Sequence, residues 1–239
     1  RRAAATAAVL AARGLRVGDR CLVHLANSVT FLDLFLACLR LGVIFVPVNV
    51  LYRDRELSHI ATDAAPALII TAAEHRALFP LDAPVATVDG IDAERDRSLH
   101  HAGALMPPAG PFVATERSPA VIIYTSGTTG RAKGAVLSHG NLVANSRHVV
   151  GSWRITAADR YLGVLPLFHV HGLANGICGW LASGCRAILV ERFDHAKAEH
   201  WFQEFQPTLF FGVPTIYTRL LELPESASAT MASSMRLFV

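Results

Sequence analysis

Short apolar runs alternate with longer stretches that are apolar on one side along the first 78 residues of the chain. Runs rich in β-branched and aromatic residues are typical of buried strands, and the longer stretches repeat their apolar positions with the period of a helix. In chain order, the pattern predicts a helix at Arg2–Arg13, a strand at Cys21–Leu25, a helix at Thr30–Leu41, a strand at Val43–Val48, a helix at Arg53–Ala64 and a strand at Ala67–Thr71. Such alternation favours an α/β fold, with mostly parallel sheets flanked by helices.

The alternation returns after residue 119. The predicted strands are Val121–Ile123, a return strand at Ala135–Ser138, a strand from Tyr161 to Pro166, Arg186–Val190 and Thr208–Phe211. Helices are predicted from His139 to about Val150 and over Leu173–Ser183. A third helix is predicted to follow Asp194, its N-cap, and to end at Phe205. Asn141 is interpreted as the N-cap of the first of these helices.

Residues 79–119 differ from both flanking regions, because several prolines and charged residues interrupt any apolar period. A long stretch of this kind predicts a loop-rich connection without chemistry of its own. We therefore divide the chain into a first αβ region (1–78), this connection (79–119) and a second region (120–239). His24, His59 and His75 each stand alone in the sequence, which favours core or surface positions for all three.

Composition narrows the class of protein. Hydrophobic residues make up 52% of the chain and charged residues 17%, with a net charge of +3, which suits a well-buried core. No basic block interleaved with aromatics indicates nucleic-acid binding. The four cysteines lie in apolar segments without a C-x-x-C pair, which favours free thiols in a reducing compartment. Without a visible signal peptide or a long apolar span, we predict a cytoplasmic protein with no stable membrane insertion; the oligomeric state stays open.

The densest chemical signal follows the strand Val121–Ile123, in the sequence Y-T-S-G-T-T-G-R-A-K-G from Tyr124 to Gly134. A strand that runs into Gly, Ser and Thr can turn its backbone N–H groups toward one point, and hydroxyls and a lysine add donors for phosphate oxygens. The alternative is a solvent-exposed turn between two strands. The length and order of the pattern favour a phosphate-binding loop.

The pattern is neither of the two common nucleotide motifs. G-x-x-x-x-G-K-[ST] fails because Ala132 stands five residues after Gly127, and no G-x-G-x-x-G occurs. The stretch instead resembles the phosphate-binding signature of the adenylate-forming (AMP-binding) superfamily, which includes acyl-CoA synthetases. The usual signature has proline where Ala132 stands, so this loop is expected to be slightly less restricted.

The resemblance implies roles for residues on and around the loop. It implies that the loop binds ATP through Thr125, Ser126, Gly127, Thr128, Thr129, Gly130 and Lys133. Mg²⁺ would bridge the phosphates, with Thr128 near the ion through ATP. Lys133 would also serve catalysis by neutralising charge on the phosphates.

A second group of candidates lies in the sequence P-L-F-H-V-H-G-L, from Pro166 to Leu173. An H-x-H pair on a strand is a known metal arrangement, which would join His169 to His171. The resemblance favours another interpretation, in which His169 lines the carboxylate pocket and acts in catalysis. The same resemblance assigns pocket-wall positions to His171, Gly172, Gly212, Val213 and Pro214.

The resemblance covers almost the whole chain but only the first half of the superfamily's length. It implies the front half of the large N-terminal domain, with the C-terminal domain absent. The implied activity is ATP-dependent activation of a small carboxylic acid and thioester formation with CoA, and the isolated fragment is expected to be inactive. Two alternatives stay open: a non-catalytic ATP-binding module, and an enzyme that loads a carrier-protein thiol. The segments around Lys133 and His169 resemble malonyl-CoA synthetase-like members, but fatty acids also suit the apolar neighbourhood.

Overall fold

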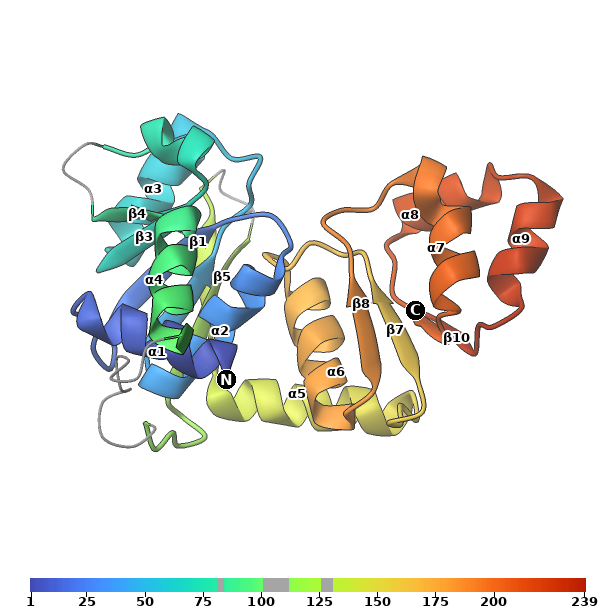
Figure 1. The fold of residues 1–239 in the computed structure, drawn as a ribbon, viewed down its shortest axis with the longest axis horizontal. Coiled ribbons are helices and arrows are strands. Elements are labelled where there is room, and N and C mark those ends of the chain that lie inside the picture. The colour runs from blue at the N-terminus through green and yellow to red at the C-terminus, as the bar shows by residue number, and fades with distance from the viewer. Residues whose placement is uncertain (81–83, 101–111, 126–130) are drawn as a thin grey trace. The chain divides into compact units, whose positions relative to one another are not determined.

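The computed structural model describes residues 1–80, 84–100, 112–125 and 131–239 (Figure 1). The chain divides into two compact units, Arg1–Asn141 and Leu142–Val239. Each unit is built on its own sheet.

The first unit contains a six-stranded sheet in the order β4-β3-β1-β2-β5-β6. Its strands are β1 (Arg20–His24), β2 (Ile44–Pro47), β3 (Leu68–Thr71), β4 (Val85–Thr87), β5 (Pro119–Thr125) and β6 (Lys133–Ser138). Neighbouring strands pair in parallel except β5 and β6, which form an antiparallel pair. The prediction of a mostly parallel sheet with a return strand is confirmed.

Helices cover both faces of this sheet. The helical elements are α1 (Arg2–Ala12), α2 (Val29–Leu41), α3 (Asp54–Ala64), the 3₁₀ helix η1 (Ala73–Leu78) and α4 (Val88–His100). Phe45 of β2 contacts the rings of Phe31 and Phe35 on α2. The next residue, Val46, belongs instead to the core cluster that contains Leu57 of α3. Because successive residues of a strand point to opposite faces, α2 and α3 lie on opposite sides of the sheet.

The predicted loop-rich connection over residues 79–119 needs correction, because it contains β4 and α4. Helix α4 has almost no apolar period to detect: its buried residues are Ile91 and Arg95. Arg95 is buried because it pairs with Asp33 of α2, and with Asp92 and Asp96 of its own helix. A helix face buried through ion pairs gives no hydrophobic signal in the sequence.

Helix α5 (His139–Ser152) corrects a second prediction. Asn141 is not the N-cap, because the helix begins at His139. Ser138 Oγ accepts from the Asn141 backbone N–H at 3.1 Å, and Asn141 Oδ1 accepts from the Ser138 N–H at 2.9 Å. This reciprocal pair has the form of a capping box with Ser138 as the cap.

The second unit contains a four-stranded parallel sheet in the order β10-β9-β7-β8. Its strands are β7 (Arg160–Gly163), β8 (Arg186–Leu189), β9 (Leu209–Phe210) and β10 (Leu237–Phe238). The helical elements are the π-helix η2 (His171–Ile177), α6 (Cys178–Ser183), the 3₁₀ helix η3 (His195–Lys197), α7 (Ala198–Phe205), α8 (Pro214–Leu221) and α9 (Glu225–Ala232). Two details of the predictions change: β7 ends at Gly163, before Pro166, and the helix predicted from Leu173 begins as a π-helix.

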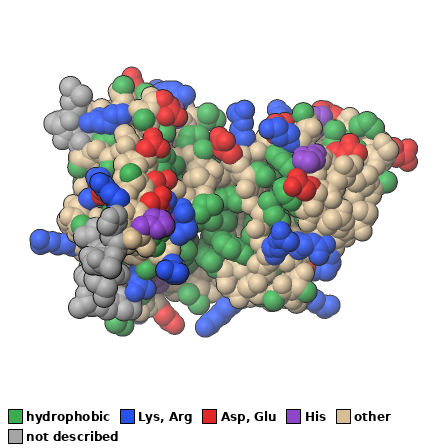
Figure 2. Space-filling view, in the orientation of Figure 1, with side chains coloured by type: hydrophobic (Ala, Val, Ile, Leu, Met, Phe, Trp, Pro, Cys, Tyr) green, Lys and Arg blue, Asp and Glu red, His purple; other side chains and the backbone are tan. Residues whose placement is uncertain are grey.

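The surface mixes charges of both signs. On the face shown in Figure 2, both Lys and Arg side chains (blue) and Asp and Glu side chains (red) are scattered among other residues. All four cysteines are buried and free. Within the residues that the structure describes, no helix has the length and apolar character needed to cross a membrane.

Candidate functional site

The β5–β6 hairpin carries the two described ends of the glycine-rich loop. Thr125, the last residue of β5, lies opposite Lys133, the first residue of β6. The Thr125 hydroxyl lies 3.5 Å from the Lys133 carbonyl oxygen. Both side chains are exposed, and Lys133 has no ion-pair partner among the described residues. A hydroxyl and an ammonium group therefore lie exposed on neighbouring strands.

The centre of the loop lies outside the described residues. Ser126, Gly127, Thr128, Thr129 and Gly130 were predicted to bind ATP, with Thr128 near Mg²⁺. Their roles stay predictions.

Helix α3 contacts both described ends of the loop. Tyr124 on β5 donates a 2.6 Å hydrogen bond from its hydroxyl to Asp63 Oδ2. On the other side, His59 Nε2 lies 2.8 Å from the carbonyl oxygen of Ala132. The sequence did not indicate either contact, since the partners lie 61 and 73 residues apart. The spacing of His59 and Asp63, four residues apart on one helix, was the available signal that they share a face.

His169 lies in the turn that precedes η2, not on a strand. Its backbone N–H donates to the Pro166 carbonyl at 3.2 Å, and its own carbonyl accepts from the Leu173 N–H at 3.0 Å. The His169 ring lies 4.7 Å from the ring of Phe168. The His169 residue is exposed overall, but local desolvation of its imidazole lowers the pKa of His169, which favours its neutral form at neutral pH.

His171 begins η2 and has a different environment. Its ring stacks on the buried ring of Phe211, with 6.3 Å between centroids and 16° between planes. Burial lowers the pKa of His171 as well. Phe211 was not among the predicted pocket residues, although it directly precedes Gly212.

Gly172 allows η2 to lie against the Pro166 turn. A Cβ at this position would come within 2.4 Å of the Pro166 carbonyl oxygen, a clash with backbone that cannot move cheaply. Gly172 is therefore required for the approach of the two segments. A π-helix at this place is notable because π-bulges are frequent at functional sites.

The predicted wall residues Gly212, Val213 and Pro214 connect β9 to α8. The Gly212 N–H donates to the Val239 carbonyl at 2.8 Å, and Pro214 is the first residue of α8. Val213 is 38% exposed, so it is available for contact. The turn thus joins the end of a buried strand to an exposed helix start. The structure brings His171 and Phe211 together, while the shared pocket of His169 and the Gly212–Pro214 turn stays a prediction.

The metal interpretation of the H-x-H pair gains no support. The described part of the chain contains no group of three His, Cys, Asp or Glu residues that could hold a metal ion. With His171 stacked on Phe211 and His169 in a turn, the two imidazoles do not lie on one strand face.

His24, for which the sequence favoured a core or surface position, is fully buried, and it lies beside His75 in the first unit. Their ring centroids are 5.2 Å apart, and His24 Nδ1 lies 3.1 Å from the Thr71 hydroxyl. His24 and Thr71 are the last residues of β1 and β3, and parallel pairing brings these strand ends side by side. The sequence could not indicate that the two histidines are neighbours, because this depends on the topology of the sheet.

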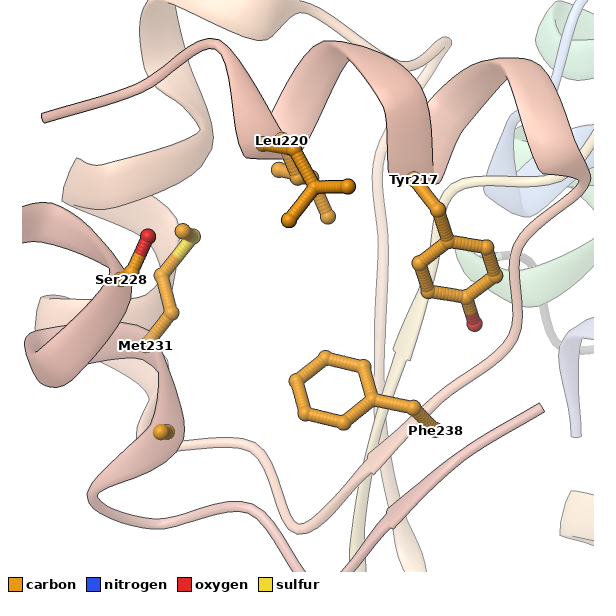
Figure 3. A pocket seen from close by; sticks show the side chains of 7 residues that line it. Tyr217, Leu220, Ser228, Met231 and Phe238 are labelled. Atoms are coloured by element: carbon orange, nitrogen blue, oxygen red, sulfur yellow. The ribbon is translucent and has the colours of Figure 1, made fainter. Parts of the chain in front are cut away.

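An apolar groove of about 350 Å³ lies in the second unit. Side chains from α8, α9 and β10 face into it (Figure 3). The lining residues are Tyr217, Leu220, Leu221, Ser228, Met231, Ala232 and Phe238.

The sequence and the fold are both similar to those of known proteins. A family model described as "AMP-binding enzyme" matches residues 1–239. A feruloyl-CoA synthase of Amycolatopsis sp is 32% identical over 98% of this chain and 46% of its own length. A malonate–CoA ligase of Arabidopsis thaliana is 30% identical over 81% of this chain and 34% of its own length. The crystal structure of ATP-bound MatB from Rhodopseudomonas palustris superimposes with a TM-score of 0.87 at 36% identity, covering 99% of this chain and 47% of that one. The chain thus spans between about a third and a half of the length of these proteins.

Proposed function

The chain belongs to the family of AMP-binding enzymes, and from this premise we propose that the full-length protein is an acid–thiol ligase that makes an acyl-CoA from a carboxylic acid, ATP and CoA. A carboxylate oxygen attacks the α-phosphorus of ATP, the bond to the β-phosphate breaks, and pyrophosphate leaves. The sulfur of CoA then attacks the acyl carbon, AMP leaves, and the thiol proton passes to solvent.

The observation that carries this proposal is the β5–β6 hairpin, which holds exposed Thr125 opposite exposed Lys133 at the two ends of the glycine-rich sequence. Both reactants of the first step are anionic, so the step needs neutralisation of charge and positioning more than a general base. Lys133 provides a positive charge for the phosphates, and Thr125 with residues 126–130 provides hydrogen-bond donors. The ATP-bound state of the MatB relative supports this assignment.

Mg²⁺ fits this scheme as a companion of ATP. As the resemblance implies, the ATP phosphates would hold the ion, with Thr128 near it. When bound, Mg²⁺ supplies further neutralisation of phosphate charge.

His169 is the proposed orienting group for the carboxylate. Because desolvation lowers its pKa, His169 offers an N–H hydrogen bond instead of a full positive charge at neutral pH. His171, stacked on Phe211, would form a flat wall for the acyl group together with Gly172 and the Gly212–Pro214 turn. CoA is favoured over a carrier-protein thiol as acceptor, because the named relatives are CoA ligases and synthases.

The test compares Lys133→Ala with His169→Ala in the full-length enzyme. Loss of a charged, preorganised donor is expected to slow carboxylate-dependent ATP–pyrophosphate exchange in Lys133→Ala by about 10²- to 10³-fold. His169→Ala should raise KM for the acid and leave KM for ATP nearly unchanged. Lys197→Ala, an exposed lysine on η3, is the matched control and should behave as wild type.

Thioester formation from a supplied acyl-adenylate isolates the second step. Lys133→Ala should change its rate little, because pyrophosphate has already left. Equal losses in both steps would indicate that Lys133 is structural and would contradict its role on the phosphates.

A further inference from the structure

We propose that α3 positions both ends of the phosphate loop, with Asp63 fixing the entry through Tyr124 and His59 fixing the exit through Ala132, a role that depends on the function proposed above. Neither residue would touch ATP. Both would be positioning residues, which hold Thr125 and Lys133 in the geometry that adenylate formation needs.

The entry is held by a buried phenol. Tyr124 is 8% exposed, and its hydroxyl donates to Asp63 at 2.6 Å. Burial and the neighbouring Asp63 carboxylate raise the pKa of Tyr124, so the hydroxyl remains a donor. The Tyr124 ring lies directly over Gly134, where there is no room for a side chain. A Cβ at Gly134 would lie 3.2 Å from Tyr124 Cζ and 2.8 Å from Ile122 Cγ2. Gly134, next to Lys133, is therefore part of the same contact.

The exit is held by an imidazole. The Ala132 carbonyl can only accept, so the His59 ring donates from Nε2 across 2.8 Å. Both the neutral Nε2–H tautomer and the imidazolium can make this bond. The methyl group of Ala132 also packs against the core cluster that contains Leu57 and Ile60. The residue directly before Lys133 is thus fixed by a hydrogen bond and by packing.

Helix α3 is a rigid support for these two bonds. Leu57 and Ile60 are 1% and 0% exposed and anchor the helix on the sheet. His59 and Asp63 lie one turn apart on the same side of α3, and their partners lie on paired strands, with Thr125 opposite Lys133. One helix therefore sets the relative position of the last residue before the loop and the first strand residue after it.

Position 132 offers an independent way to impose the same restriction. Alanine leaves φ free, whereas proline would fix it near −65°. Among the described residues, the Ala132 N–H has no acceptor that proline would remove. If His59 serves to restrict the loop exit, proline at 132 should partly replace it.

The experiment uses the full-length enzyme and measures ATP–pyrophosphate exchange alongside thioester formation from a supplied acyl-adenylate. His59→Ala should reduce kcat/KM for ATP in exchange by roughly two- to tenfold, the effect of one uncharged hydrogen bond, and leave thioester formation unchanged. His59→Gln, whose amide nitrogen can reach the position of Nε2, should retain most activity. His59→Ala combined with Ala132→Pro should recover part of the loss.

Tyr124→Phe tests the entry and should act in the same direction as His59→Ala, while Asp63→Asn keeps an acceptor and should act weakly. His148→Ala, an exposed histidine on α5, is the control. The positioning role alone would be overturned if His59→Ala shows the same exchange rate as wild type. It would also be overturned if the variant loses exchange and thioester formation equally. Absence of any carboxylate-dependent exchange by wild type would overturn the proposed function and this role with it.

Discussion

At the scale of single residues, His24 and His75 differ in burial although both are isolated in the sequence. His24 is fully buried, and its pKa falls from 6.5 to about 4. Burial is the largest cause, followed by the nearby charges of His75 and Arg53. The imidazole of His24 is therefore neutral in the folded protein, because burial disfavours the protonated form.

This environment makes stability depend on pH. Because the pKa is lower in the folded state than in the unfolded state, the unfolded chain binds the proton first as pH falls. The contribution of His24 is complete above about pH 6.5 and decreases toward pH 4, with a loss of about 2 kcal/mol by pH 5. We expect the Tm of the full-length protein to decrease when the pH is lowered from 7.5 to 5.0. The Tm of His24→Gln should decrease less over the same range.

His148→Gln is the control, since this exposed histidine should leave the wild-type pH dependence intact. An identical decrease of Tm in wild type and His24→Gln would show that other groups titrate instead.

Residue-level prediction was possible where the chemistry is local in sequence, and the phosphate-binding role of the loop stays a prediction because residues 126–130 lie outside the described residues. The glycines, hydroxyls and lysine near residue 125 form one continuous pattern, so a phosphate loop could be predicted without a fold. His59 could not be assigned, because its partner lies 73 residues away and is a backbone carbonyl. Phe211 was missed for a similar reason: only the fold shows that its ring stacks on His171.

At the scale of elements, the periodic spacing of apolar residues predicted many of the strands and helices. It failed where the buried face of a helix is charged. α1, α2 and α3 were predicted to within a few residues, because each buries an apolar face. α4 was missed because it is held by ion pairs. Arg95, 3% exposed, pairs with Asp33, which also pairs with Arg2 of α1 at 2.8 Å.

Removing Arg95 should therefore loosen α4 selectively. Arg95→Ala leaves the buried Asp33 carboxylate with less compensation, and breaking a buried pair costs about 3–5 kcal/mol. We expect faster amide hydrogen exchange across α4 and a lower Tm, while exchange in the second unit stays as in wild type. Arg55→Ala, at an exposed position on α3, is the matched control. If amide hydrogen exchange in α4 is equally fast in Arg95→Ala and in wild type, the account is contradicted.

At the scale of the whole molecule, the second unit exposes an apolar surface. The groove of Figure 3 includes Leu221, 82% exposed, and Phe238, 44% exposed, beside the edge strand β10. Exposed apolar surface next to an edge strand promotes association between chains.

We therefore expect an isolated chain of residues 1–239 to self-associate as concentration rises. Leu221→Lys should shift light scattering toward the monomer. Leu51→Lys changes a similarly exposed leucine of the first unit (72% exposed) and should have no such effect. If the wild-type chain stays monomeric at high concentration, the groove does not drive association. The same conclusion follows if Leu221→Lys and Leu51→Lys change the light scattering equally.

The central claim is that a carboxylate of the substrate attacks the α-phosphate of ATP. The most direct measurement supplies the full-length enzyme with ATP, CoA and a carboxylic acid labelled with ¹⁸O in both carboxylate oxygens, and analyses the products by mass spectrometry. The account predicts that one ¹⁸O appears in AMP, one remains in the acyl thioester, and pyrophosphate is unlabelled. Label in inorganic phosphate, with ADP as the other product, would mean attack on the γ-phosphate and would contradict the account.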